Sequence, residues 1–122
     1  MLPLLRALAL AALPTVLAGP ALAHAILMDS TPAPGATVEA GEALLTARFN
    51  SRVDHERSRL LLRQGQGAGA TETVLPLRPG AAADQLQAAT TLAPGAYTLR
   101  WQVLAVDGHV TRGDVPFTVK AR

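Results

Sequence analysis

Residues 97–103 read Tyr-Thr-Leu-Arg-Trp-Gln-Val, a strict alternation between large apolar and polar side chains. Successive side chains of a β-strand point to opposite faces of the sheet, so this stretch places its two aromatic and two aliphatic side chains on one face. The polar side chains then occupy the other face. The stretch predicts a central strand with one face in a hydrophobic core.

Shorter segments of the same kind lie on both sides of this stretch and are separated by turn signals. Pro and Gly occur at residues 32–35, 65–69, 79–80 and 94–95, and Asp107-Gly108 is a leading hairpin dipeptide. About seven short strands in one domain predict an all-β fold, either a β-sandwich or a small barrel with Greek-key connections. The further strand candidates are residues 43–49, 60–62, 74–77, 85–89 and 115–119, with a single helical turn as the alternative for 85–89. The expected core aromatics are Phe49, Tyr97, Trp101 and Phe117.

The first 23 residues are typical of a secretory signal peptide. They contain Arg6, an apolar run over residues 8–17 and the small-x-small sequence Ala21-Leu22-Ala23. Cleavage after Ala23 would leave residues 24–122 as a single domain. The apolar run is too short and too interrupted by proline for a stable membrane span. We therefore expect an exported domain that does not insert into the membrane once it is cleaved.

Composition excludes several classes of site. One of the eleven Lys and Arg precedes residue 24 and all nine Asp and Glu follow it, which leaves a net side-chain charge of +1 and little support for nucleic-acid binding. The chain has no cysteine, and Met28 is the sole methionine beyond the leader. A metal site must therefore use nitrogen and oxygen ligands, because soft sulfur donors are nearly absent.

Cleavage after Ala23 would make His24 the first residue and place a free α-amine beside its imidazole. These two nitrogens can chelate a transition metal from a single residue. Asp107 and His109 stand two residues apart, so in an extended strand their side chains would share a face and converge. The simpler alternatives are that Asp107-Gly108 is only a turn and that His24 is an incidental terminal residue.

Together the three residues offer three nitrogens and one carboxylate oxygen. This donor set suits a tetragonal Cu(II) ion, and Cu(II) stands highest in the affinity order of divalent metals. Zn(II) accepts similar donors, so it stays open as an alternative. Because the metal must displace protons from the nitrogens, we expect its affinity to fall as the pH drops from about 8 to 5.

Six motifs along the mature sequence occur together and in order: His24-Ala25, Ser30-Thr31-Pro32-Ala33-Pro34-Gly35, Phe49-Asn50-Ser51, residues 92–101, residues 103–113 and Phe117-Thr118-Val119. With these motifs the mature sequence resembles the CopC/YobA-like family of small copper-binding proteins, and the resemblance implies a location in the periplasm. It also implies an immunoglobulin-like Greek-key β-sandwich that binds one Cu(II) through the N-terminal His, an Asp and a second His, here His24, Asp107 and His109. The expected partner is an inner-membrane protein of the CopD copper-transport type, or the role is one in copper resistance.

Two departures from the family pattern bear on the site. The methionine-rich Cu(I) site of some members has no counterpart, so we expect one Cu(II) and no relay of Cu(I). Some members carry a Glu after the strand that here ends at Phe49, where this chain has Asn50-Ser51-Arg52. A carboxylate ligand from that loop is therefore not expected. His55 lies just beyond it and is interpreted as a solvated loop residue rather than a ligand.

The leading hypothesis is a monomeric Cu(II) carrier or buffer that has no enzymatic activity. An oxidative copper enzyme resembling a lytic polysaccharide monooxygenase is a second hypothesis, since those enzymes also use an N-terminal His with another His. The short chain and its few aromatic residues count against a flat polysaccharide-binding face. A metal-free exported interaction domain, with His24 and His109 incidental, is the third.

Overall fold

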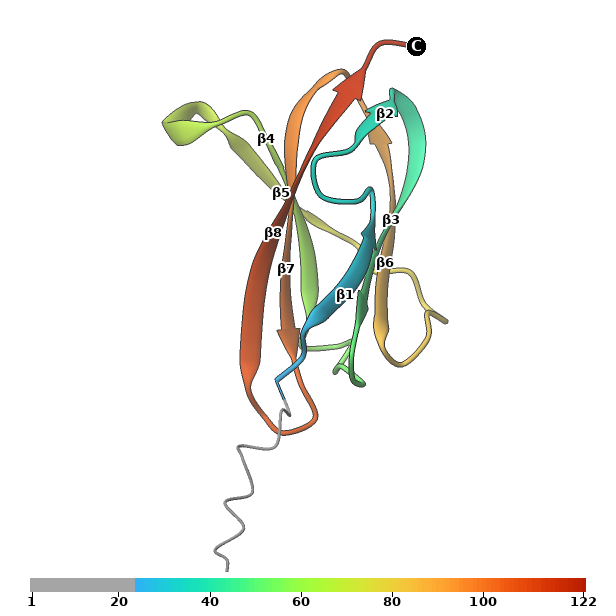
Figure 1. Ribbon diagram of the computed structural model, residues 1–122, viewed down its shortest axis with the longest axis vertical. Helices are drawn as coiled ribbons and strands as arrows, with labels where there is room; N and C mark the ends of the chain where they lie inside the picture. The colour runs from blue at the N-terminus through green and yellow to red at the C-terminus, as the bar shows by residue number, and fades with distance from the viewer. Residues whose placement is uncertain (1–23) are drawn as a thin grey trace, which may run out of the picture.

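The computed structural model describes residues 24–122, which form two β-sheets packed face to face (Figure 1). The predicted leader, residues 1–23, lies outside the described residues. The smaller sheet has the order β1 (Leu27–Thr31), β3 (Gly41–Phe49), β6 (Gln85–Leu92). The larger sheet has the order β2 (Thr37–Glu39), β8 (Val110–Lys120), β7 (Gly95–Leu104), β4 (Arg59–Gln64), β5 (Thr71–Leu75).

The connectivity confirms the predicted immunoglobulin-like Greek-key sandwich. The chain crosses between the sheets at every connection except β4 to β5 and β7 to β8. Strands within a sheet pair antiparallel apart from the parallel β2–β8 pair. Tyr97, near the start of β7, donates a hydrogen bond of 2.7 Å from its hydroxyl to the Ala93 carbonyl. A tyrosine that bonds back to the preceding corner in this way is a feature of immunoglobulin-like domains.

The structure differs from the sequence-based strand assignments in three places. It has eight strands rather than about seven, because residues 27–31 form β1 and residues 37–39 form the short β2 against the end of β8, and neither was among the candidates. The strand expected at 74–77 lies at 71–75 instead, where it pairs with β4 from Gln64↔Thr71 to Leu60↔Leu75. The strand expected at 85–89 is confirmed, since residues 85–92 form β6 and no helical turn. The loop at 65–69 contains a 3-10 turn, Gly67–Gly69. In residues 24–122, no helix is long and apolar enough to span a membrane.

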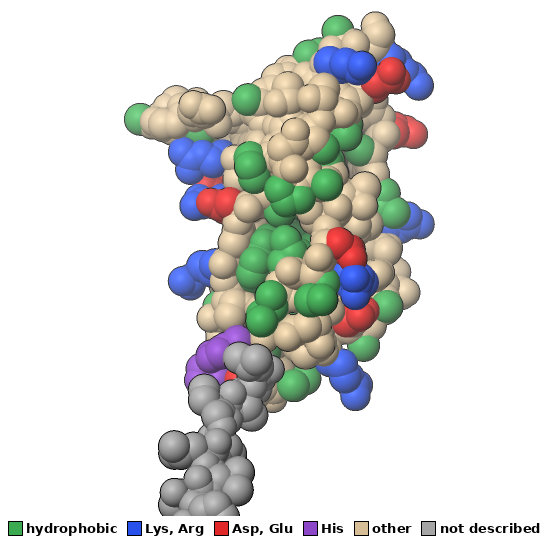
Figure 2. Space-filling model, viewed as in Figure 1, with side chains coloured by type: hydrophobic (Ala, Val, Ile, Leu, Met, Phe, Trp, Pro, Cys, Tyr) green, Lys and Arg blue, Asp and Glu red, His purple; other side chains and the backbone are tan. Residues whose placement is uncertain are grey.

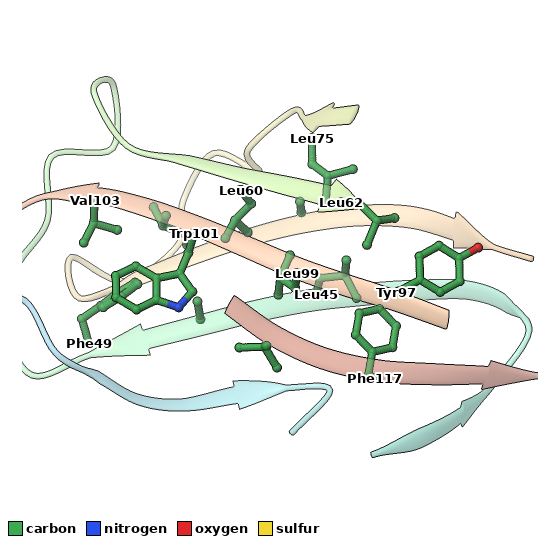
Figure 3. Close-up of a cluster of buried hydrophobic side chains, with 14 of the residues drawn as sticks. Leu45, Phe49, Leu60, Leu62, Leu75, Tyr97, Leu99, Trp101, Val103 and Phe117 are labelled. Atoms are coloured by element: carbon green, nitrogen blue, oxygen red, sulfur yellow. The ribbon is translucent and has the colours of Figure 1, made fainter. Parts of the chain in front are cut away.

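The core lies between the sheets and takes side chains from both (Figure 3). Phe49 on β3 meets Trp101 on β7 edge to face, with ring centroids 5.1 Å apart, and Tyr97 stacks on Phe117 at 5.4 Å. All four expected core aromatics are therefore buried in pairs. The Phe49–Trp101 pair joins the two sheets, and the Tyr97–Phe117 pair joins the neighbouring strands β7 and β8. Such aromatic contacts add to the free energy gained by burying apolar area.

Gly113 on β8 is the residue that makes room for the Trp101 ring. The two residues are register partners, and a Cβ at position 113 would lie 2.8 Å from Trp101 Nε1 and closer still to two ring carbons. Among residues 24–122 the Trp101 indole N–H has no hydrogen-bond partner. The ring is therefore held by packing alone, and the absence of a side chain at Gly113 is a condition of that packing.

We expect Gly113→Ala to lower the free energy of unfolding by about 1–3 kcal/mol, because the added methyl must displace a buried indole. Urea unfolding followed by Trp101 emission measures the effect. Gly69→Ala is the matched control, since a Cβ there meets nothing within 4 Å and its φ is not positive. Equal stability of the two variants would contradict the packing role of Gly113.

Candidate metal centre

His24, Asp107 and His109 lie at one end of the sandwich, where the described chain begins and where β7 turns back into β8. Figure 1 shows these two segments side by side, and Figure 2 shows histidine side chains gathered at the same end. One potential ligand atom from each of the three residues lies within 4.8 Å of the others. Within residues 24–122, these three residues form the group of His, Asp and Glu side chains whose ligand atoms lie close enough together to hold a metal ion.

The turn that carries Asp107 and His109 is fixed by its own backbone. Gly108 N–H donates to the Ala105 carbonyl at 3.0 Å, and Ala105 N–H donates to the His109 carbonyl at 2.9 Å. Gly108 has a φ of 85°, a conformation that side chains with a Cβ rarely adopt. The two residues were expected to share a face of an extended strand, and this was wrong: they converge because the Asp-Gly turn folds them together.

Asp107 holds His109 by two hydrogen bonds. Its Oδ1 accepts the His109 backbone N–H at 3.0 Å, and its Oδ2 lies 2.7 Å from His109 Nδ1. A carboxylate can only accept, so Nδ1 carries the proton and donates it. Neutral imidazole then has its lone pair on Nε2, the arrangement that metal-binding histidines commonly use when a carboxylate orients them.

The same contacts stabilise the charged form of Asp107. The backbone N–H of His109 holds the pKa of the Asp107 carboxyl below its usual range. The hydrogen bond to the His109 ring, the charge of that ring and the charge of His24 act in the same direction, while partial burial opposes them. The site thus keeps a negative charge facing the histidines at neutral pH.

His24, the first described residue, lies against this pair. Its ring meets that of His109 edge to face, with centroids 4.7 Å apart and an interplanar angle of 68°. The His109 side chain is 62% exposed and that of Asp107 is 19% exposed. A solvated ion or a partner protein can therefore reach the histidines directly, whereas the carboxylate is largely covered.

The loop after β3 pairs with Leu104 and Ala105, just before the Asp107–His109 turn. Val53 forms an isolated bridge with Ala105, and Asp54 N–H donates to the Leu104 carbonyl at 2.9 Å. Asp54 in turn accepts the backbone N–H groups of Arg57 and Glu56, which lower the pKa of its carboxyl. These bonds link the position of the turn to the loop after β3.

His55, in the same loop, is not part of the group. Its Nε2 donates to the Gln85 carbonyl at 2.7 Å, which ties the loop to the start of β6. The ring is half-buried rather than solvated, so the interpretation as a free loop histidine was wrong in that respect.

Two residues that touch the start of the chain were not identified as functional from the sequence. Asn50 accepts the Ile26 N–H, and Thr111 donates to the Ala25 carbonyl. Asn50 lies in the loop where some family members carry a Glu and this chain does not. That departure was the feature of the sequence that pointed to this loop. Thr111 carried none, because its contact partner lies 86 residues away.

We expect Asp107→Ala to destabilise the metal-free protein at neutral pH and to have less effect in acid. A carboxylate with a lowered folded-state pKa contributes stability above its unfolded pKa, near 3.9, and loses it as the pH falls through the folded value. Thermal unfolding between pH 7 and 2 measures the difference. Asp107→Asn is the control, since it keeps an acceptor for the His109 N–H. A deficit for Asp107→Ala that is constant over this range would contradict the assignment.

Comparisons with known proteins agree with this architecture. The family model described as the CopC domain matches residues 27–120. Protein YobA from Escherichia coli K12 is 32% identical over 125 aligned positions that cover 92% of each chain. The crystal structure of CopC from Methylosinus trichosporium OB3b superposes with a TM-score of 0.69 at 27% identity, over 81% of this chain and 96% of that one.

A second solved structure, PcoC from Escherichia coli, is described as a methionine-rich copper resistance protein. It superposes with a TM-score of 0.66 over 80% of this chain and its full length, at 24% identity, which supports the fold. The family match spans most of the chain, and the YobA alignment covers nearly the whole of both sequences. This protein belongs to the CopC family.

Proposed function

We propose that the protein, once cleaved after Ala23, binds one Cu(II) ion through His24, Asp107 and His109. The observation that carries the proposal is the meeting of these three side chains within 4.8 Å at an open end of the fold. Cleavage would add the α-amine of His24 to the same group. The ligands would then be the amine, two imidazole nitrogens and a carboxylate oxygen.

The chemistry of these donors supports Cu(II) over other ions. Four nitrogen and oxygen donors favour tetragonal Cu(II), whereas Cu(I) prefers thiolate and thioether ligands. The chain has no cysteine and a single methionine beyond the leader, Met28. Membership of the CopC family supports the same choice, because the resemblance implies a copper-binding domain. Zn(II), which takes similar donors, is the competitor that a titration must include.

Asp107 and His109 would act as a preorganised half of the site. Asp107 holds the His109 ring through Nδ1, so Nε2 presents its lone pair without a search among ring orientations. The carboxylate also supplies negative charge beside the incoming cation. His24, from a segment far away in the sequence, would then supply the amine and the second imidazole.

We propose that the protein acts in the periplasm as a carrier or buffer that delivers Cu(II) to, or receives it from, a membrane copper transporter of the CopD type. The exposure of the His109 ring supports transfer, because a second set of ligands can approach the ion before the first has released it. Uptake and resistance are both compatible with such an exchange.

We expect that moving the α-amine will abolish tight binding. Protein that begins at His24 should bind one Cu(II), whereas protein that begins at Ala23 should lose at least about tenfold in affinity, the scale on which perturbing a metal site usually acts. The extra residue keeps the His24 imidazole and converts its amine to an amide. Competition titration with a chelator gives the affinity, and electron paramagnetic resonance gives the number of nitrogen donors. Equal affinity of the two forms would refute the proposed site.

We expect His24→Ala and His109→Ala each to remove Cu(II) binding, and His55→Ala to leave it unchanged. His55 is the matched control, because its ring bonds to the Gln85 carbonyl away from the group. Saturating Cu(II) should raise the melting temperature of the wild type and of His55→Ala, since a ligand that binds the folded state stabilises it by mass action. Binding that survives loss of His109 would place the ion elsewhere.

A further inference from the structure

Hydrogen bonds tie the segment that directly follows His24 to both sheets. Ala25 is 2% exposed and belongs to the hydrophobic core, so its methyl group anchors the segment between the sheets. Its neighbours on either side, His24 and Ile26, are exposed. The orientation of His24 therefore depends on what fixes the peptide groups around Ala25.

Asn50 fixes this segment from the smaller sheet. The antiparallel pairing of β1 with β3 reaches Leu27↔Phe49, so Ile26 and Asn50 would form the next pair. Asn50 N–H does donate to the Ile26 carbonyl at 3.0 Å, but the return bond from Ile26 N–H goes to Asn50 Oδ1 at 2.7 Å. The side-chain amide replaces the backbone acceptor and extends the ladder by one residue beyond the strand.

Thr111 fixes the same segment from the larger sheet. It pairs with Val103 on the β7–β8 ladder, two residues beyond His109. Its hydroxyl donates to the Ala25 carbonyl at 3.0 Å, which joins the peptide bond after Ala25 to the strand that follows the ligand turn. One threonine thus sets the distance between the two halves of the ligand group.

We propose that Asn50 and Thr111 are positioning residues that hold the N-terminal segment so that His24 presents its amine and imidazole to the ion held by Asp107 and His109. The inference rests on the proposed Cu(II) site and concerns how it is preorganised. Neither side chain is a ligand. Without them the segment keeps its Ala25 anchor, but the peptide group that joins Ala25 to Ile26 loses both of its side-chain hydrogen bonds. The free energy of binding then includes the cost of ordering the segment that carries His24.

The test uses processed protein that begins at His24. Thr111→Val keeps the shape of the side chain and removes the donor, and we expect it to weaken Cu(II) binding by about tenfold or more, the usual loss when a residue that orients a ligand is removed. Thr111→Ser restores the hydroxyl and should restore the affinity. Thr98→Val makes the same exchange on β7, on the outer face of the sheet, and should bind as the wild type does. Asn50→Ala is the second variant and should act in the same direction as Thr111→Val.

A double-mutant comparison separates positioning from general destabilisation. In protein that begins at Ala23, the α-amine of His24 is already converted to an amide, so Thr111→Val should lower the Cu(II) affinity of that protein little further. If the two changes acted independently, their effects on the binding free energy would add. The paramagnetic resonance spectrum of Thr111→Val should also report fewer or inequivalent nitrogen donors at the same folded fraction. An unchanged spectrum and affinity would overturn the positioning role. Failure of the wild type itself to bind Cu(II) would overturn the proposed function instead.

Discussion

The antiparallel pairing of β7 with β8 is the interaction on which both the core and the ligand group depend. The pairing is continuous from Gly95↔Val119 to Leu104↔Val110. It puts Tyr97, Leu99, Trp101 and Val103 on the inner face and places the Asp107–His109 turn at the end of the ladder. Side chains alternate along a strand, so a shift of one residue in this register would expose the aromatic core and also re-aim the turn. Stability and site geometry are therefore set by the same hydrogen bonds.

The tight packing inside this pair explains why a glycine, Gly113, occurs where a strand would favour a branched residue. Gly113 weakens β8 as an isolated strand, since glycine loses more conformational freedom on folding than other residues. The loss is offset by the Trp101 ring, which covers the glycine and reaches Phe49 on the opposite sheet. The position two residues nearer the turn is Thr111, which contacts the start of the chain. Along β8, Gly113 thus makes room for a core side chain, and the next inward-facing residue, Thr111, contacts the segment that carries His24.

The sequence predicted the fold well because its signals are local and periodic. The alternation at residues 97–103 and the Asp107-Gly108 turn both appear in the structure as expected. The short β2 was missed because three residues carry too little pattern, and β5 was displaced because its exposed residues Thr71 to Val74 lack an apolar stripe. The proximity of His24 to His109 was expected from pairing two halves of a donor set and from the resemblance to the CopC/YobA-like family, not from a local pattern. The contacts of Asn50 and Thr111 join residues far apart in sequence, and no local pattern encodes them.

The location of His24 connects the chemistry of the proposed site to the processing of the chain. A peptide nitrogen is a poor metal donor, because its lone pair is delocalised into the carbonyl and the group is planar. An uncleaved chain would therefore offer His24 as an imidazole alone, whereas the cleaved chain would offer a chelating pair on a single residue. The other parts of the proposed site are already in place in the fold: Ala25 is buried, Asn50 and Thr111 hold the peptide group that joins Ala25 to Ile26, and Asp107 orients His109. In the proposed function, cleavage after Ala23 supplies the α-amine last, so high affinity for Cu(II) would arise only after cleavage and not during synthesis.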